Sequence, residues 1–309
     1  MLNKIPFSIW IILGVAIALI FPEPFKEING LSTKVFIIPL LQIIMVGMGA
    51  IMRINDFKSI LIQPKAVIIG VICQLTIMPF VGLLVVQFFD FPPEIAAGII
   101  LIGSMPGGLA SNVMTYLARA NIALSVTLTS ISTLLSALVT PFWMKVLANQ
   151  YIEIDFWKMF WEIIQLIILP IGIGVFYRII FKDRFKFIDN NLSRISMWGI
   201  AIVLMIISAF GRDSLIEVGL LMIVAGLLHN SLGYLLGYQI ARILKLSEPD
   251  RRTIAIEVGM QNAGLASGIA IAMNKVATLG VAAVVFGPLM NITGSTLANY
   301  WKDKEILEE

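Results

Sequence analysis

Ten long apolar stretches constrain this chain more than any other feature. They cover most of the 309 residues, at about 5–22, 33–52, 66–89, 94–117, 122–147, 157–180, 190–210, 216–243, 251–273 and 277–300. About 20 apolar residues span the hydrocarbon core of a bilayer. Backbone groups in that core must bond to one another, and the stretches lack the alternating polar pattern of a membrane barrel. The sequence therefore predicts an all-α polytopic membrane protein with ten transmembrane helices.

The positions of Lys and Arg predict how these helices are oriented. Ten spans place both termini on one side, and a cytoplasmic N-terminus puts most of the 22 basic residues in cytoplasmic connections. The positive-inside rule favours this orientation. We expect a multi-pass protein of a bacterial-type inner (cytoplasmic) membrane with both termini cytoplasmic, and we interpret the first stretch as a retained helix rather than a signal peptide. The basic residues then serve topology in a lipid bilayer, and no nucleic-acid partner is expected.

The tetrapeptide Gly-Leu-Ala-Ser occurs twice, each time inside an apolar stretch. It occupies residues 108–111 and 264–267, a shift of 156, and the same shift aligns Gln74 with Asn230. Each half of the chain holds five spans, and because five is odd the second half enters the membrane upside down. Glycine-interrupted spans at equivalent places in inverted repeats are typical of secondary transporters, whose binding site lies at the repeat interface.

Both repeated segments contain residues that interrupt a helix. In the first, Pro106 lacks a backbone donor, and Gly107 and Gly108 relax the chain further. The second segment is polar and rich in glycine over residues 257–264. Where a helix unwinds, freed carbonyls can bind a hard cation, and the N-terminus of the next half-helix can attract an anion. A kink without an ion site is the alternative for either segment taken alone.

Glu257 is the carboxylate that lies deepest in an apolar stretch. A charge at mid-membrane costs about 3 kcal/mol, so it needs a partner. The nearest basic residues along the chain, Arg251 and Arg252, lie almost two helical turns away. We therefore interpret Glu257 as a ligand for a mobile cation. A protonated glutamic acid bonded to a neighbouring helix is the alternative.

Neutral side chains near the first break can complete such a site. Ser125 and Thr129 follow the break on one helix face, and Gln74 lies in the preceding span. Oxygen ligands suit Na⁺ better than a transition metal, and the single cysteine, Cys73, excludes a cysteine metal cluster. Na⁺ is therefore expected as a coupling ion, with no other cofactor. His229 is interpreted as a packing residue rather than a proton carrier.

Two runs carry the most specific signal, PGGLASNVMTYLARANIALSVTLTS at residues 106–130 and IEVGMQNAGLAS at residues 256–267. On a frame of ten spans in two inverted repeats, they resemble the bacterial branch of the bile acid:sodium symporter family, and the similarity extends over essentially the whole chain. The resemblance implies a first Na⁺ site formed by Ser111, Asn112, Ser125, Thr129 and Glu257. It implies a second Na⁺ site formed by Gln74, Glu257, Gln261 and the carbonyls of Val258 and Met260.

The same resemblance implies how the spans are grouped. A single transporter unit, residues 1–309, would contain a panel domain at about 5–54 and 155–212 and a core domain at about 64–150 and 214–301. The broken fourth and ninth spans would cross near mid-membrane, with substrate in the crevice between the domains. The candidate substrate contacts lie at this crossing and in the last span, and are Gly108, Leu109, Asn262, Ala263, Gly264 and Asn291. Some relatives carry His at the position of Met290.

These features predict a sodium-coupled secondary symporter that imports an organic anion by alternating access, with two Na⁺ per substrate. The anion is either a bile-acid-like amphipath or a small carboxylate such as pantoate or a keto acid. A sodium-dependent channel or ligand sensor with the same fold is the alternative, and uptake against a gradient separates the two. No enzyme is expected, because no second carboxylate accompanies Glu257 and no Gly-x-Ser-x-Gly turn is present.

Overall fold

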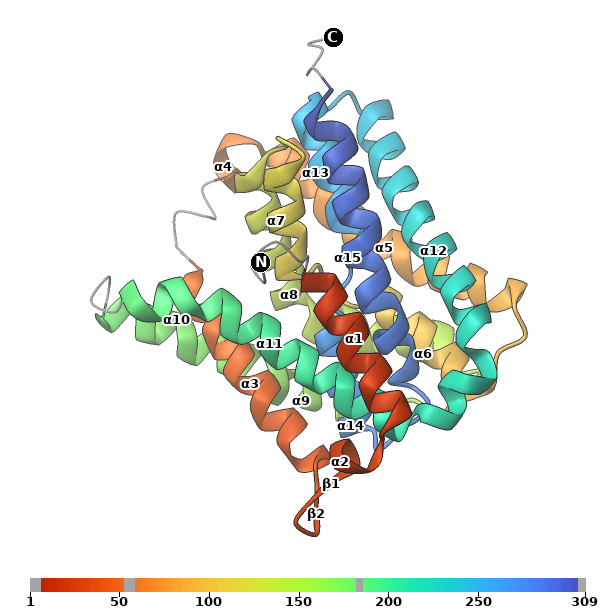
Figure 1. The fold of residues 1–309 in the computed structure, drawn as a ribbon. Coiled ribbons are helices and arrows are strands. Elements are labelled where there is room, and N and C mark those ends of the chain that lie inside the picture. The colour runs from red at the N-terminus through yellow and green to blue at the C-terminus, as the bar shows by residue number, and fades with distance from the viewer. Residues whose placement is uncertain (1–6, 53–58, 182–185, 305–309) are drawn as a thin grey trace.

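The computed structural model describes residues 7–52, 59–181 and 186–304 and is drawn in Figure 1. Most of these residues are helical, as the apolar stretches predict. One short hairpin, which the apolar stretches do not predict, is formed by β1 (Glu27–Ile28) and β2 (Leu31–Ser32). Asn29 and Gly30 form its turn, with φ angles of 51° and 82°. An Asn-Gly pair favours this two-residue turn because both positions need a positive φ.

The helices of the first half follow the predicted stretches closely. The fourth stretch is divided between two helices, and the fifth continues beyond its α-helix into a π-helical turn, Met144–Ala148. The elements are α1 (Phe7–Ile20), α2 (Glu23–Lys26), α3 (Lys34–Ile51), α4 (Ser59–Ile62), α5 (Pro64–Phe88), α6 (Pro93–Gly103), α7 (Leu109–Leu117) and α8 (Ile122–Trp143).

The second half shows the same division in its fourth stretch. Its elements are α9 (Phe156–Ile163), α10 (Leu169–Phe181), α11 (Lys186–Phe210), α12 (Arg212–Ile243), α13 (Glu248–Gly259), α14 (Ala263–Ala272) and α15 (Val281–Lys302). A π-helical turn, Ile164–Ile168, joins α9 to α10. Pro170 cannot donate a hydrogen bond to the carbonyl of Leu166, which favours an irregular turn at this place.

The length and surface of the helices are those of a polytopic membrane protein. Among the described residues, five helices are long and apolar enough to cross a membrane: Pro64–Phe88, Ile122–Ala148, Phe156–Phe181, Arg212–Ile243 and Val281–Lys302. Shorter apolar helices occupy the other predicted stretches. Large apolar side chains such as Ile68, Phe176 and Leu220 are more than half exposed. An apolar surface of this extent is suited to lipid rather than to water.

One group of helices is built around the pair α3 and α10. α3 lies along α10 and also packs against α11, which in turn contacts α1 (Figure 1). A Cβ atom on Gly49 would lie 2.1 Å from the carbonyl oxygen of Ile171, and one on Gly174 would lie 2.0 Å from the carbonyl oxygen of Val46. Only glycine fits at these two positions, so α3 and α10 touch through their backbones.

A second group is built around α12, which packs against α5, α13 and α15. Gly233 allows α12 to approach the end of α13 closely, because a Cβ atom there would lie 2.8 Å from the Cα atom of Gly259. A side chain on Gly259 would meet the ring of Tyr234 at 2.1 Å. These close contacts fix the end of α13, where its helix stops, against the middle of α12.

Candidate functional site

Two helices are interrupted, and their interruptions meet at one place, the crossing. α6 ends at Gly103 and the chain resumes helical structure at Leu109, while α13 ends at Gly259 and α14 begins at Ala263. Gly107 forms an antiparallel bridge with Gln261, and the backbone N–H of Asn262 donates to the carbonyl of Pro106 at 3.0 Å. The predicted breaks in the fourth and ninth stretches are therefore confirmed, and the two breaks lie side by side.

Glu257 lies beside this crossing and is fully buried. Its carboxylate accepts hydrogen bonds from the hydroxyl groups of three side chains. The distances are 2.6 Å from Ser111, 2.5 Å from Ser125 and 2.9 Å from Thr129. The structure thus brings together residues from α7, α8 and α13 that are far apart in the sequence.

The oxygen atoms around Glu257 outnumber the protons available to them. The hydroxyl oxygen of Ser111 lies 2.6 Å from both the Glu257 carboxylate and the carbonyl of Gly108, although a hydroxyl donates one proton. The hydroxyl of Ser125 likewise contacts the side-chain oxygen of Asn112 at 2.7 Å as well as Glu257. A buried set of close oxygens with one formal negative charge and too few protons has the chemistry of a site for a hard cation.

Gly107 makes room for the carboxylate. A Cβ atom at this position would lie 2.6 Å from Oε2 of Glu257, closer than real Cβ contacts allow. The sequence pattern identified Gly107 as part of a helix break but did not identify this second role. An alignment of the two repeats could not have found it, because the residue equivalent to Glu257 in the first half is Leu101.

The predicted ligands of the second ion site form a separate cluster. The amide nitrogen of Gln74 donates to Oε1 of Gln261 at 3.0 Å, and the amide nitrogen of Gln261 donates to the carbonyl of Val258 at 2.8 Å. Oε1 of Gln74 is buried and has no hydrogen-bond partner among the described residues. Met260 is the first residue after α13, and its backbone N–H donates to the carbonyl of Ile256. The hydrogen bonds of the Glu257 side chain go to the first cluster, not to either glutamine.

The basic residues near Glu257 in the sequence are engaged elsewhere. Nε of Arg252 lies 2.8 Å from Oε1 of Glu248, and Arg251 lies 3.7 Å from the same carboxylate. Arg252 also donates to the carbonyls of Ala118 and Trp301 at the ends of α7 and α15. These contacts agree with the expectation that Arg251 and Arg252 do not neutralise Glu257.

The candidate substrate contacts differ in how exposed they are. Gly108 and Leu109, at the start of α7, are partly exposed, whereas Asn262, Ala263 and Gly264, at the start of α14, are buried. The side-chain oxygen of Asn262 accepts from the N–H of Leu265 and caps α14. Asn291 is partly exposed, and its amide donates to the carbonyl of Gly287 within α15.

The helices that follow the two interruptions, α7 and α14, pack against different neighbours, although the tetrapeptide Gly-Leu-Ala-Ser lies at the start of both. α14 packs against α3, α9 and α11, and a Cβ atom on its Gly268 would lie 2.5 Å from Leu166 and 2.7 Å from Leu41. α7 packs against α8, α13 and α15 instead, and its Val113 and Tyr116 are more than half exposed. Among the described residues, the group built on α3 and α10 packs closely on α14 and makes no comparable contact with α7.

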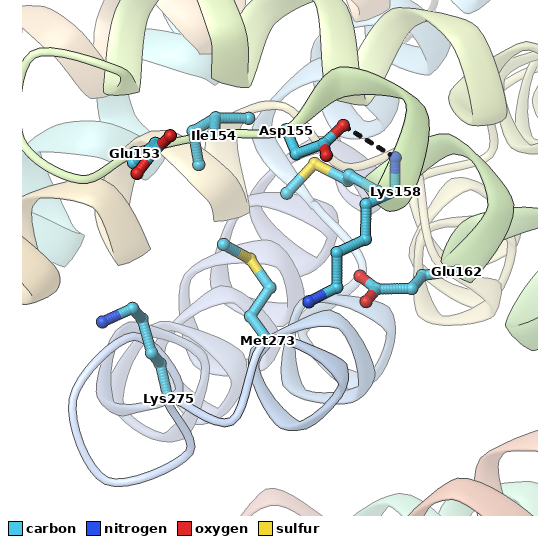
Figure 2. Close-up of a pocket in the computed structure, with 8 residues that line it drawn as sticks. Glu153, Ile154, Asp155, Lys158, Glu162, Met273 and Lys275 are labelled. Atoms are coloured by element: carbon cyan, nitrogen blue, oxygen red, sulfur yellow. Dashed lines mark hydrogen bonds between the residues drawn. The ribbon is translucent and has the colours of Figure 1, made fainter.

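A cavity of about 320 Å³ lies apart from the crossing, between the start of α9 and the segment that follows α14. Figure 2 shows its charged lining of three carboxylates and two lysines, together with apolar side chains; the lining residues are Glu153, Ile154, Asp155, Lys158, Met159, Glu162, Met273 and Lys275. Lys275 is ion-paired with Glu94. None of the predicted ion or substrate residues lines this cavity.

Several known proteins are similar in sequence to this chain over most of its length. Residues 38–218 match the Sodium Bile acid symporter family. The "Uncharacterized sodium-dependent transporter YocS" of Bacillus subtilis (strain 168) is 39% identical over 298 residues, which cover 96% of this chain and 91% of that protein. The "Probable sodium/metabolite cotransporter BASS1, chloroplastic" of Arabidopsis thaliana is 34% identical over 298 residues, covering 96% and 73%. The "Ileal sodium/bile acid cotransporter" of Homo sapiens is 30% identical over 260 residues, covering 81% and 73%.

Proposed function

We propose that this chain, which belongs to the sodium bile acid symporter family, is a sodium-coupled symporter that imports an organic anion. The observation that carries the proposal is the buried carboxylate of Glu257, held among hydroxyl and carbonyl oxygens that lack enough protons to bond one another. Among the described residues, no group of three His, Cys, Asp or Glu side chains offers a site for a transition metal. Oxygen ligands at an unwound helix suit Na⁺, and the names of the relatives refer to sodium.

The first Na⁺ would be held by Glu257 and its neighbours on α7 and α8. Ser111, Ser125 and Thr129 would turn their hydroxyl protons outward and present oxygen lone pairs to the ion, and Asn112 would add its amide oxygen. Each hydroxyl has two lone pairs and a proton that rotates freely, so this change needs no movement of the backbone.

A second Na⁺ would be held at the cluster of Gln74 and Gln261. The buried, unpartnered Oε1 of Gln74 supports a ligand role for this amide. The amide nitrogen of Gln261 would release the carbonyl of Val258, which would become free to coordinate, and Oε1 of Gln261 would offer the ion the lone pair that its bond from Gln74 leaves free. The carbonyl of Met260 and a carboxylate oxygen of Glu257 would complete the set.

The arrangement of the helices supports transport by alternating access. We infer ten spans in two inverted repeats, with both termini in the cytoplasm of a bacterial-type cell and the breaks near mid-membrane. Helices α1, α3, α9, α10 and α11 would form the panel domain, and the remaining spans the core. In this orientation α7 lies in the cytoplasmic half of the membrane, and a crevice between α7 and the panel domain would open to the inside. If the panel domain instead packed against α7 and separated from α14, the crevice would open to the outside.

The substrate would lie at the exposed start of α7. A helix N-terminus attracts an anionic group, and Gly108 and Leu109 leave this one accessible, whereas the start of α14 is covered. Asn291 would contribute an amide after releasing its bond to Gly287. These groups recognise a carboxylate or a sulfonate on either a bile-acid-like amphipath or a small molecule such as pantoate or a keto acid.

Uptake into proteoliposomes tests this function directly. Purified protein would be reconstituted and offered a panel of labelled anions with and without an inward Na⁺ gradient. We expect at least one organic anion to accumulate above its external concentration only when the Na⁺ gradient is present. Equilibration without accumulation would indicate a channel, and saturable binding without uptake would indicate a sensor.

Single alanine substitutions should raise the Na⁺ requirement at either proposed ion site. We expect Ser125→Ala, Thr129→Ala, Gln74→Ala and Gln261→Ala each to weaken Na⁺ binding by roughly 5- to 150-fold, because one polar contact is worth about 1–3 kcal/mol. Na⁺ titration of the purified variants measures this effect. Ser136→Ala is a matched control, because this hydroxyl bonds to the carbonyl of Thr133 within its own helix. Unchanged affinity in all four variants would assign these residues to packing.

Gly107→Ala should damage the first ion site without removing a ligand. The added methyl group would meet Oε2 of Glu257 at 2.6 Å and push the carboxylate from its contact with Thr129. We expect a Na⁺ requirement raised by roughly 5- to 150-fold, the equivalent of one lost polar contact. Na⁺ titration compares this variant with Gly172→Ala, where the methyl group would meet no atom within 4 Å. Equal affinities in the two variants would contradict the geometry.

A further inference from the structure

His229 and Asn230 form a second buried polar group near the crossing. Both side chains lie in α12 and are completely buried. Both ring nitrogens of His229 and both polar atoms of the Asn230 amide have no hydrogen-bond partner among the described residues. The two residues are adjacent on a helix, where successive side chains point about 100° apart, so they cannot satisfy each other fully. A hydrogen bond between the two side chains would satisfy at most one polar atom of each, so at least two of these four buried atoms need another partner.

The surroundings of this pair are the end of α6 and the apolar face of α15. A Cβ atom on Gly103, the last residue of α6, would lie 3.2 Å from Nε2 of His229. The ring centroids of His229 and Phe286 are 5.2 Å apart. The carbonyls of Ile100, Leu101 and Ile102 at this helix end already accept the backbone N–H groups of residues 104 and 105, and Phe286 has no polar side-chain atom. A molecule bonded to His229 would therefore lie beside the last residue of α6, next to the break between α6 and α7.

The repeat relates Asn230 to a residue of the second proposed ion site. Asn230 is equivalent to Gln74, and the amide nitrogen of Gln74 lies 3.0 Å from Gln261 and 3.5 Å from the carbonyl of Met105. Met105 and Gln261 are themselves equivalent, since they are separated by the repeat distance of 156 residues. A two-fold relation that exchanges Met105 with Gln261 places Asn230 across the crossing from Gln74. Two amides thus flank the crossing, one with a partner and one without.

The chemistry of the four atoms selects the ligand. A neutral imidazole has one donor and one acceptor, and a primary amide has two donors and one acceptor oxygen. A cation would pair only with the acceptors and would leave the donors buried and unsatisfied. A water molecule both donates and accepts, and buried waters typically make about three hydrogen bonds to such groups. We infer that His229 and Asn230 bind ordered water at the end of α6, as a water site that does not bind the coupling ion.

A structure at a resolution that resolves ordered water tests this inference, with crystals of the full chain soaked in Tl⁺. We expect a density peak about 2.7–3.2 Å from polar atoms of both His229 and Asn230. We expect no anomalous signal from Tl⁺ at this peak. An anomalous peak there would make the pair a cation site, and side chains bonded directly to each other or to backbone groups would leave no water to bind. Either result would overturn the inference.

A matched pair of substitutions separates this site from the ion sites in solution. Asn230→Leu and Gln74→Leu make similar amide-to-leucine changes at equivalent positions of the two repeats. We expect the Na⁺ concentration for half-maximal thermal stabilisation to change less than about 2-fold in Asn230→Leu and at least about 5-fold in Gln74→Leu. A shift in Asn230→Leu as large as that expected for Gln74→Leu would overturn the water assignment. A small shift in both variants would count against the proposed second Na⁺ site and would still support the water site.

Discussion

Glu257→Ala is expected to abolish sodium-dependent uptake. The substitution removes the negative charge of the first ion site and leaves the hydroxyls of Ser111, Ser125 and Thr129 without their buried acceptor. Removing one partner of a buried charge pair costs about 3–5 kcal/mol, which corresponds to roughly 150- to 4000-fold in Na⁺ affinity. Glu257→Gln keeps the shape but not the charge, and we expect it to be nearly as damaging.

Uptake and Na⁺ binding should be measured on the same preparations of these variants. Glu153→Gln is the control, because it makes the same chemical change at an exposed carboxylate in the cavity of Figure 2. The control should transport normally. Normal Na⁺ stimulation in Glu257→Ala or Glu257→Gln would show that the carboxylate is not an ion ligand, and the proposed coupling mechanism would fall with it.

Transport of a monoanion is expected to be electrogenic. If two Na⁺ enter with one monoanion, each cycle carries one net positive charge inward. An inside-negative potential then contributes about 2.3 kcal/mol per 100 mV. Because each 1.4 kcal/mol is a factor of ten, this potential multiplies accumulation by roughly 50-fold per 100 mV. Two separate clusters of neutral oxygen ligands, one around Glu257 and one around Gln74 and Gln261, are the reason to expect two ions.

A potassium-diffusion potential across the vesicle membrane tests this expectation. Na⁺ and the monoanion are held at fixed concentrations, and vesicles without protein report the passive leak. Accumulation should rise steeply as the interior becomes negative. Uptake that is indifferent to the potential would indicate one Na⁺ per anion, and the second ion site would have to be withdrawn.

The sequence predicted the helices and the breaks well because local chemistry determines both. Pro106 and the glycines beside it disfavour a continuous helix, and the polar, glycine-rich segment 257–264 contains the second interruption, at residues 260–262. The cluster of Ser111, Ser125, Thr129 and Glu257 agrees with the ligand set that the resemblance to the bile acid:sodium symporter family implies. The Asn29–Gly30 hairpin was overlooked although its turn signal is local and strong.

Features that depend on packing between distant segments could not be predicted in this way. The room that Gly107 leaves for Glu257 exists only because α13 crosses the first break at that residue. The different surroundings of α7 and α14 are a sharper case, since both begin with Gly-Leu-Ala-Ser. Identical tetrapeptides have the same local preferences. The difference in exposure between α7 and α14 therefore depends on how the rest of the fold packs around them.

The backbone contact between α3 and α10 has a consequence for how such a molecule can move. At Gly49 and Gly174 no side chain lies between the two helices, so no change of rotamer can relieve strain when one helix slides along the other. The contact of Gly268 with Leu41 and Leu166 is different, because leucine side chains can change between staggered rotamers. An interface lined by leucine side chains can open gradually, whereas an interface made of backbone atoms either stays closed or separates completely. Helices α3 and α10 should therefore move together as one rigid unit, and the interface that opens should be the one between this unit and α14.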